Sequence, residues 1–311
     1  MPPSRGILSV ELPAESLTTG HRSMFLWKKY FVAKSIPEVL DKLDEGARLI
    51  AGGTDLLLEM QQGIQPPVET LVDVCNLQEL NALEIRGEEL FIGAAVPLNK
   101  IVVSTDVKEN AQALVEACSL IGGPQVRNSA TLGGNVAHAL PAADGTIALL
   151  ALNAYAETIN KKGLRRTGIE DLFLGPRQSK IESDQELLVG FYLPLQKKAQ
   201  ASAFNRVMRP QGVALPILNM AVWLERDKDR IIDAHIALGP SGPRPFRARN
   251  AEKCLISGRY DPTLVEDVYE IMLAEVHLRT SPQRATADYR KHLARFLLQE
   301  VIETAWERAI N

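Results

Sequence analysis

Apolar and polar positions in the first part of the chain follow short periodic runs, which predict a series of small helices and strands. The run Ser35-Ile36-Pro37-Glu38 precedes apolar residues at helical spacing and Gly46 follows them, so a capped amphipathic helix is expected between them. A brief apolar run at 48–51 enters Gly52-Gly53, as a buried strand entering a tight loop does. Further short strands are expected at 71–74, 82–86 and 89–94. The last two read as a hairpin through Gly87-Glu88.

The middle of the chain predicts two buried helices and another strand pair. Segment 106–120 has apolar residues at the i, i+4, i+7 spacing of a helix packed on one face, and it ends at Gly122-Gly123. Segment 144–152 is apolar enough for a fully buried helix. Strands are expected at 154–160 and 186–193, with Lys161-Lys162-Gly163 between the two arms of a hairpin.

The pattern changes near residue 195. Segments 203–208, 217–225 and 231–238 predict a three-stranded antiparallel meander. A helix starting at Asp261-Pro262 and running to about Leu278, and a long amphipathic helix at 286–309, complete the chain. A mixed α/β body at 24–195, with subdomains at about 24–80 and 81–195, is therefore expected before a smaller domain at 196–311. Residues 1–23 are interpreted as a peripheral arm.

The composition and charge of the chain argue against several classes of function. The 311 residues are 46% apolar, and 35 basic against 38 acidic residues give a net charge of -3, which does not favour binding to nucleic acid or anionic lipid. No run approaches the roughly 20 apolar residues of a membrane helix, and no secretory signal opens the chain. Three dispersed cysteines exclude a disulfide framework or a CxxC site, so a cytoplasmic location is expected.

Two glycine pairs lie in similar settings, at 51–55 and 131–135. Each has a hydroxyl residue and a short polar residue beside the pair: Thr54 and Asp55 in the first loop, Thr131 and Asn135 in the second. Such loops suit a diphosphate, because glycine permits close backbone approach and successive N–H groups can bind an anion. The alternative is that both double glycines are ordinary turns.

The common motifs for other chemistries are absent from the sequence. Neither loop matches the Rossmann or P-loop pattern, the five histidines are too dispersed for a helical metal pair, and no G-x-S-x-G occurs. A Rossmann domain, a P-loop NTPase, a metal site and a hydrolase are therefore not indicated.

Several polar side chains near the loops have both a functional and a structural interpretation. Asp144 is a candidate to accept from a ribose hydroxyl, or it is a helix N-cap. Arg127, Arg206 and Arg209 are candidates for pairing with phosphate, or they form structural ion pairs. His138 follows the second loop and either touches a cofactor or is an internally satisfied histidine.

The paired loops and their surroundings resemble the FAD-binding medium subunit of molybdenum hydroxylases, a family that includes the medium subunit of carbon monoxide dehydrogenase and the flavin domain of xanthine dehydrogenase. The resemblance covers the chain from about Phe25 to its end. It rests on the segments 51–55, 124–128, 130–135, 141–144, 186–188, 193–194, 245–252 and 284–290.

The resemblance implies an α+β fold, with a PCMH-type (vanillyl-alcohol-oxidase-like) FAD-binding domain of two α/β subdomains, followed by the C-terminal domain of these flavoproteins with its three-stranded sheet and helices. It places Ile121 beside the flavin ring, Asp144 against the FAD and Leu188 near the other end of the cofactor. The diphosphate-binding positions that it implies are Ala51, Gly52, Gly53, Thr54, Asp55, Thr131, Leu132, Gly133, Gly134 and Asn135.

One segment departs from the family pattern. Gly212-Val213-Ala214 stand where familiar members carry an acidic and then a bulky residue near the flavin ring, which leaves the electron acceptor open. The family branch with an extra 4Fe-4S cluster needs four clustered cysteines, and this chain has three dispersed ones.

The function implied by the resemblance is electron relay. FAD in this chain would receive electrons from a 2Fe-2S small subunit, supplied by a molybdenum-cofactor large subunit in a dimer of heterotrimers, and pass them to NAD or a quinone; no catalytic side chain and no metal site is expected in this chain. The alternatives are a self-contained FAD-dependent reductase or oxidase of the same cofactor fold, and an interaction protein that has lost its cofactor.

Overall fold

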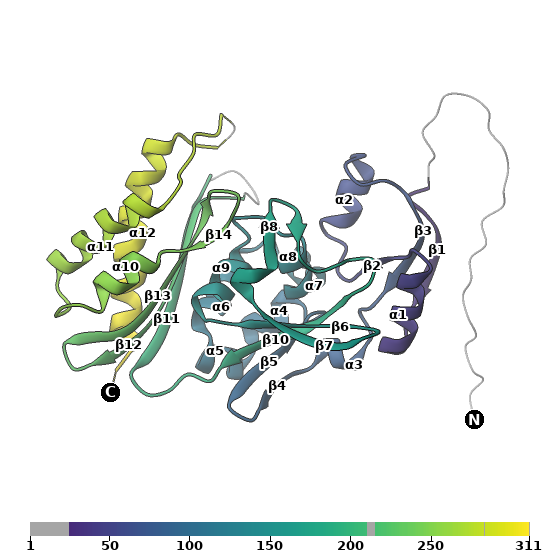
Figure 1. The fold of residues 1–311 in the computed structure, drawn as a ribbon, viewed down its shortest axis with the longest axis horizontal. Coiled ribbons are helices and arrows are strands. Elements are labelled where there is room, and N and C mark those ends of the chain that lie inside the picture. Colours follow the sequence, from purple (N-terminus) through teal and green to yellow (C-terminus); the bar gives the residue numbers. More distant parts are fainter. Residues whose placement is uncertain (1–24, 210–214, 283, 311) are drawn as a thin grey trace.

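The computed structural model describes residues 25–209, 215–282 and 284–310. Within these residues, three larger sheets follow one another along the length of the molecule, with helices packed between and outside them (Figure 1). A fourth sheet is small and has two strands. No helix in the described part of the chain is long and apolar enough to cross a membrane.

The first sheet is parallel and has three strands in the order β1-β3-β2: β1 (Trp27–Val32), β3 (Val68–Asp73) and β2 (Arg48–Ile50). Helix α1 (Ile36–Asp44) links β1 to β2, and α2 (Leu56–Gln61) links β2 to β3. Ser35 caps α1 by accepting a hydrogen bond from the Glu38 N–H at 3.4 Å, as its sequence predicts. Val39, Leu40 and Leu43 of α1 are buried in a core shared with the second sheet.

The second sheet is antiparallel, in the order β4-β5-β10-β6-β7. The predicted hairpin is confirmed: β4 and β5 turn at Gly87, whose φ is +65°. The other predicted hairpin is wrong, because β6 pairs through the tight turn at Gly163 with β7, and β10 pairs with the opposite edge of β6. The bounds are β4 (Leu83–Arg86), β5 (Glu89–Gly93), β6 (Tyr155–Asn160), β7 (Gly163–Gly168) and β10 (Leu187–Pro194).

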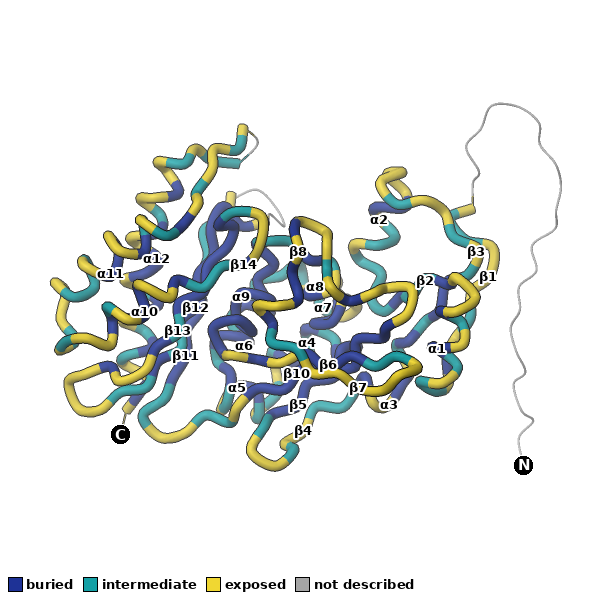
Figure 2. Tube along the Cα trace, viewed as in Figure 1, coloured by how far each residue is buried: buried dark blue, intermediate teal, exposed yellow. Residues whose placement is uncertain are grey.

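Short helices cover the second sheet. The helix predicted at 106–120 is divided at Ala111, whose φ of -150° is not helical, into α5 (Thr105–Asn110) and α6 (Gln112–Leu120). Helix α9 (Asp144–Ala151) is buried throughout, as its uniform apolar sequence predicts (Figure 2). The remaining elements of this region are α3 (Gln78–Asn81), α4 (Leu98–Val103), α7 (Pro124–Ser129), α8 (Leu132–Ala137), the 3-10 helix η1 (Ile169–Leu172) and the ribbon β8 (Phe173–Gly175) with β9 (Gln178–Ser179).

The third sheet contains the predicted meander and one strand more: β11 (Gln200–Met208), β12 (Pro216–Asp227), β13 (Arg230–Ser241) and β14 (Arg244–Arg247). The expected three-stranded sheet is thus four-stranded, because the chain reverses again at Gly242, with φ +71°.

Helices flank both faces of this third sheet. Helices α10 (Arg249–Leu255), α11 (Pro262–Glu275) and α12 (Ala287–Arg308) pack against one face, and α6 and α9 pack against the other (Figure 1). Helices α11 and α12 start at Asp261 and Thr286, as predicted, and these two residues are their N-caps. Helix α11 ends at Glu275 rather than near Leu278.

Candidate cofactor site

The first glycine loop, 51–55, connects β2 to α2 and touches the second loop region through its backbone. A β-carbon on Gly52 would overlap the carbonyl of Ser129, which lies at the end of α7 just before the second loop. Gly53 has a φ of +67°, a conformation that favours glycine. Both glycines are therefore required by the geometry of the loop.

The backbone N–H groups of this first loop are available to a ligand. Among the described residues, the N–H groups of 52–55 have no hydrogen-bond acceptor, and the four residues are half-buried or exposed. Unpaired consecutive N–H groups are a binding site for an anion. The loop therefore has the donor set that the predicted diphosphate contact requires.

The second glycine loop is built differently. Thr131 caps α8, its hydroxyl accepting from the Gly134 N–H at 3.0 Å, and the Gly133 N–H donates to the Ala94 carbonyl at 2.9 Å. The Leu132 N–H donates to the Val96 carbonyl at 3.4 Å. The expectation that both loops present a row of free N–H groups is wrong for this loop, because its first amides donate to carbonyls of the turn that follows β5.

Two features of the second loop remain open to a ligand. Gly134 is exposed, and a β-carbon there would meet only the Thr131 hydroxyl, at 3.2 Å. The side-chain oxygen of Asn135 is buried and has no hydrogen-bond partner among the described residues. A buried acceptor without a partner is costly, so a donor from a bound molecule would satisfy it. These residues fit the polar part of a dinucleotide.

Asp144 lies in a buried ion pair rather than at a helix N-cap, which is Ala143. Its carboxylate accepts from the guanidinium of Arg206 and from the side-chain amide of Asn219, the latter at 2.6 Å. Burial raises the pKa of Asp144, and the charge of Arg206 and the Asn219 hydrogen bond oppose that rise. Arg206 also donates to the Leu120 carbonyl, so one guanidinium from β11 joins α6 to α9.

Four further predicted residues have structural contacts of their own. Ile121 follows α6 and is partly buried against the core, and its carbonyl accepts from Arg127 at 3.3 Å. Arg127 also donates to the Gly122 carbonyl at 2.7 Å, so it holds this glycine turn. Leu188 is buried in β10 opposite Thr158. Arg209 donates to the Arg284 carbonyl, and Gly212-Val213-Ala214 lie outside the described residues.

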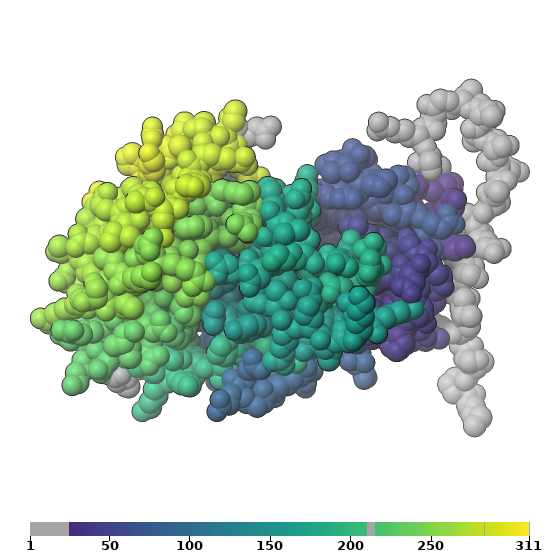
Figure 3. All heavy atoms as spheres, viewed as in Figure 1, coloured from purple at the N-terminus to yellow at the C-terminus, as the bar shows by residue number. Residues whose placement is uncertain are grey.

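His138 belongs to a charged cluster that sequence reasoning did not find. Its Nε2 lies 2.9 Å from Oε1 of Glu59 in α2, and the guanidinium of Arg177 lies 2.9 Å from the same oxygen. Arg177 lies in the turn between β8 and β9. In Figure 3 the teal atoms of this region border the blue atoms of α2. Glu59, His138 and Arg177 are hereafter the Glu59 cluster. No sequence spacing could have linked residues so far apart along the chain.

The electrostatics of the Glu59 cluster favour an ionised carboxylate. Glu59 is 6% exposed, and burial by itself would raise its pKa. Hydrogen bonds from His138 and Gln65, together with the charges of His138 and Arg177, outweigh burial and lower that pKa. His138 Nδ1 also lies 3.8 Å from the Asp55 carboxylate, so the imidazole lies between two acidic groups.

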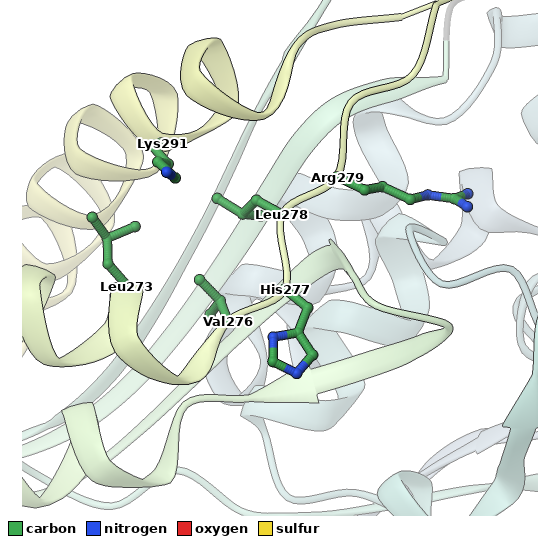
Figure 4. A pocket seen from close by; sticks show the side chains of 6 residues that line it. All are labelled: Leu273, Val276, His277, Leu278, Arg279 and Lys291. Carbon is green, nitrogen blue, oxygen red and sulfur yellow. The ribbon is translucent and has the colours of Figure 1, made fainter.

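A separate hollow of about 350 Å³ lies between the end of α11 and the start of α12 (Figure 4). Its lining is an apolar floor with basic groups at the side: Leu273, Val276, His277, Leu278, Arg279 and Lys291. None of the residues predicted to bind the cofactor lines it. The candidate site is therefore the region of the two glycine loops.

Comparison with known proteins identifies the family of the chain. The family model for the FAD binding domain in molybdopterin dehydrogenase matches residues 23–196, and the CO dehydrogenase flavoprotein C-terminal domain matches residues 202–305. The xanthine dehydrogenase FAD-binding subunit of Escherichia coli O157:H7 is 29% identical over 91% of this chain and 97% of its own length. The nicotine 6-hydroxylase medium subunit of Paenarthrobacter nicotinovorans is 30% identical over 90% of this chain and 98% of its own.

Solved structures give the same result. The carbon monoxide dehydrogenase of Hydrogenophaga pseudoflava has a chain that superposes with a TM-score of 0.85 at 27% identity, covering 90% of this chain and 97% of that one. Quinoline 2-oxidoreductase from Pseudomonas putida 86 gives a TM-score of 0.84 at 27% identity, covering 91% and 98%. The chain therefore belongs to the family of FAD-binding medium subunits of molybdenum hydroxylases.

Proposed function

We propose that this chain binds the FAD diphosphate at the first glycine loop, against Gly134 and Asn135 of the second, and relays electrons from a partner to an external acceptor. The observation that carries the proposal is the row of unpaired N–H groups at 52–55, in backbone contact with the second loop region through Gly52 and Ser129. When bound, FAD supplies the redox chemistry. The side chains of this chain therefore need only bind and orient the cofactor.

The protein's own groups have distinct roles in this proposal. The N–H groups of 52–55 bind the diphosphate oxygens, and Thr54 adds a hydroxyl donor. The Asn135 side-chain oxygen accepts a hydrogen bond from the cofactor. Ile121 packs beside the flavin ring, and Leu188 packs near the other end of the cofactor. Asp144 contributes by fixing the N-terminus of α9 beside Asn135, through its pair with Arg206.

The proposed partners follow the names of the relatives. The nicotine 6-hydroxylase and carbon monoxide dehydrogenase relatives are medium chains, which implies further subunits in those enzymes. For this chain we propose a 2Fe-2S small subunit as electron donor and a molybdenum-cofactor large subunit as the site of substrate oxidation, assembled as a dimer of heterotrimers. NAD or a quinone is the proposed acceptor.

Reconstitution tests this assignment. The chain is purified, loaded with FAD and mixed with its two partner subunits and a reducible acceptor, either NAD or a quinone. Bleaching of the flavin absorbance by the organic substrate should require both partners, and acceptor reduction should require FAD. Oxidation of a small substrate by the FAD-loaded chain alone would contradict the relay and support a self-contained oxidoreductase.

A further inference from the structure

The Glu59 cluster connects the two glycine loops through the helices that follow them. The Glu59 N–H donates to the Asp55 carbonyl at 2.9 Å, so Glu59 lies one helical turn after the first loop. The His138 N–H donates to the Gly134 carbonyl at 3.1 Å, so His138 lies one turn after the second loop. The contact between the Glu59 and His138 side chains therefore joins the two loops a second time, beyond Gly52 and Ser129.

We propose that Glu59 is a positioning residue that, through His138 and Arg177, sets the spacing of the two glycine loops and so controls how slowly FAD leaves. This inference rests on the proposed FAD function. No residue of the Glu59 cluster is required to touch the cofactor.

The attachment of α2 makes Glu59 suited to this role. Glu59 and Met60 are the buried residues of α2, whereas Leu58 beside them is 50% exposed. A short helix with so little buried surface is held weakly by apolar packing. The polar contacts of Glu59 therefore carry much of the attachment of the first loop to the rest of the molecule.

Arg177 connects a third structural element, the β8–β9 turn, to the carboxylate of Glu59. Its own N–H donates to the Ala139 carbonyl at 2.9 Å, which fixes the β8–β9 turn beside the residue that follows His138. Gln65 donates to the second carboxylate oxygen of Glu59 at 3.3 Å. Both carboxylate oxygens of Glu59 thus have hydrogen-bond partners. Removing one partner leaves the buried carboxylate with fewer hydrogen bonds and weakens the contact between α2 and the rest of the molecule.

The test measures FAD release from the full-length chain. Flavin fluorescence is followed after dilution of the loaded protein for Glu59→Gln, His138→Gln and the double variant. Each single variant should release FAD about tenfold faster, the effect expected for losing a charged hydrogen bond. The double variant should release FAD no faster than the faster single variant, because both substitutions break one contact.

Two further variants keep the test decisive. Arg177→Met removes the half-exposed partner of Glu59, so it should fold and should also speed release. Arg295→Gln breaks an exposed ion pair with Glu266 between α11 and α12 and should leave release unchanged.

The outcomes separate this inference from the proposed function. Release rates within twofold of the parent in Glu59→Gln and Arg177→Met, or multiplicative rates in the double variant, would overturn the positioning role while leaving FAD binding intact. A parent chain that holds no FAD would instead contradict the proposed function itself. Faster release together with unchanged circular dichroism supports positioning, because a purely structural role would lower the unfolding temperature without changing release from the folded chain.

Discussion

The carbonyl of Ser129 occupies the space that a side chain on Gly52 would need, which places the two glycine loop regions in direct backbone contact. This close approach explains the requirement for glycine at that position without any reference to a ligand. It also places the unpaired N–H groups of 52–55 next to the segment that leads into the second loop. The contact is a property of the fold on which the proposed cofactor site depends.

Gly52→Ala should therefore damage both stability and FAD binding. The new methyl group would force the loops apart, at a cost of about 1–3 kcal/mol for overpacking. Urea unfolding of the apoprotein measures the first effect, and FAD titration measures the second. An unchanged unfolding midpoint would show that the loops separate freely and that their contact is not needed.

Gly134→Val should separate ligand binding from folding. Gly134 is helical and a β-carbon there meets only the Thr131 hydroxyl, so the apoprotein should lose about 1 kcal/mol or less. The isopropyl group would project into the space assigned to the diphosphate and should abolish FAD retention. Gly258→Val is the control, because a β-carbon there would meet only the Leu264 side chain, at 3.8 Å, and Gly258 lies between α10 and α11 in the C-terminal region. FAD retained by Gly134→Val at the parental affinity would remove Gly134 from the site.

Asp144→Asn should be strongly destabilising. The substitution leaves the guanidinium of Arg206, 5% exposed, without its carboxylate, and loss of one partner of a buried pair costs about 3–5 kcal/mol. Arg249→Met, which breaks an exposed pair with Glu170, should cost at most about 1 kcal/mol. Chemical denaturation of both variants checks the contrast. Equal losses in the two variants would contradict the account of Asp144 as the anion of a buried pair.

The pH dependence of stability should contain a contribution from Glu59. Its pKa is lower in the folded protein than in the unfolded chain, so the unfolded state binds its proton more readily. The resulting stabilisation is complete at pH values above the pKa of Glu59 in the unfolded chain. It is lost as the pH falls through the pKa of Glu59 in the folded protein. Stability of the parent should thus fall more steeply below about pH 5 than that of Glu59→Gln, in which this group does not titrate. Parallel pH profiles of the two proteins would show that the ion pair contributes nothing.

Local signals predicted much of the fold. Ser35 caps its helix as expected, and the helices predicted to start at Asp261 and Thr286 do start there, because such signals depend on neighbouring residues alone. Strand β1 was not predicted, because Lys28, Lys29 and Tyr30 are exposed at the edge of the sheet and leave no alternating apolar pattern. The hairpin error at Gly163 has the same origin, since the residues of β7 are exposed or half-exposed and show no alternating apolar pattern.

Of the candidate site, the sequence indicates the parts that depend on neighbouring residues and not those that depend on tertiary contacts. Glycine pairs are visible in a sequence, and the first loop does contact the segment that leads into the second. The first amides of the second loop donate to the backbone carbonyls of Ala94 and Val96. A backbone acceptor of this kind does not depend on the side chain, so the sequence does not reveal it. The Glu59 cluster and the Arg206 pair with Asp144 depend on tertiary contacts between distant residues, which no periodicity records.

The most direct test of the proposed cofactor site is the visible absorption spectrum of the purified chain, followed by heat release and chromatographic identification of any yellow compound. The account predicts releasable FAD at one molecule per chain, without iron or molybdenum, and its loss in Gly134→Val. A colourless chain that also fails to take up added FAD would contradict it.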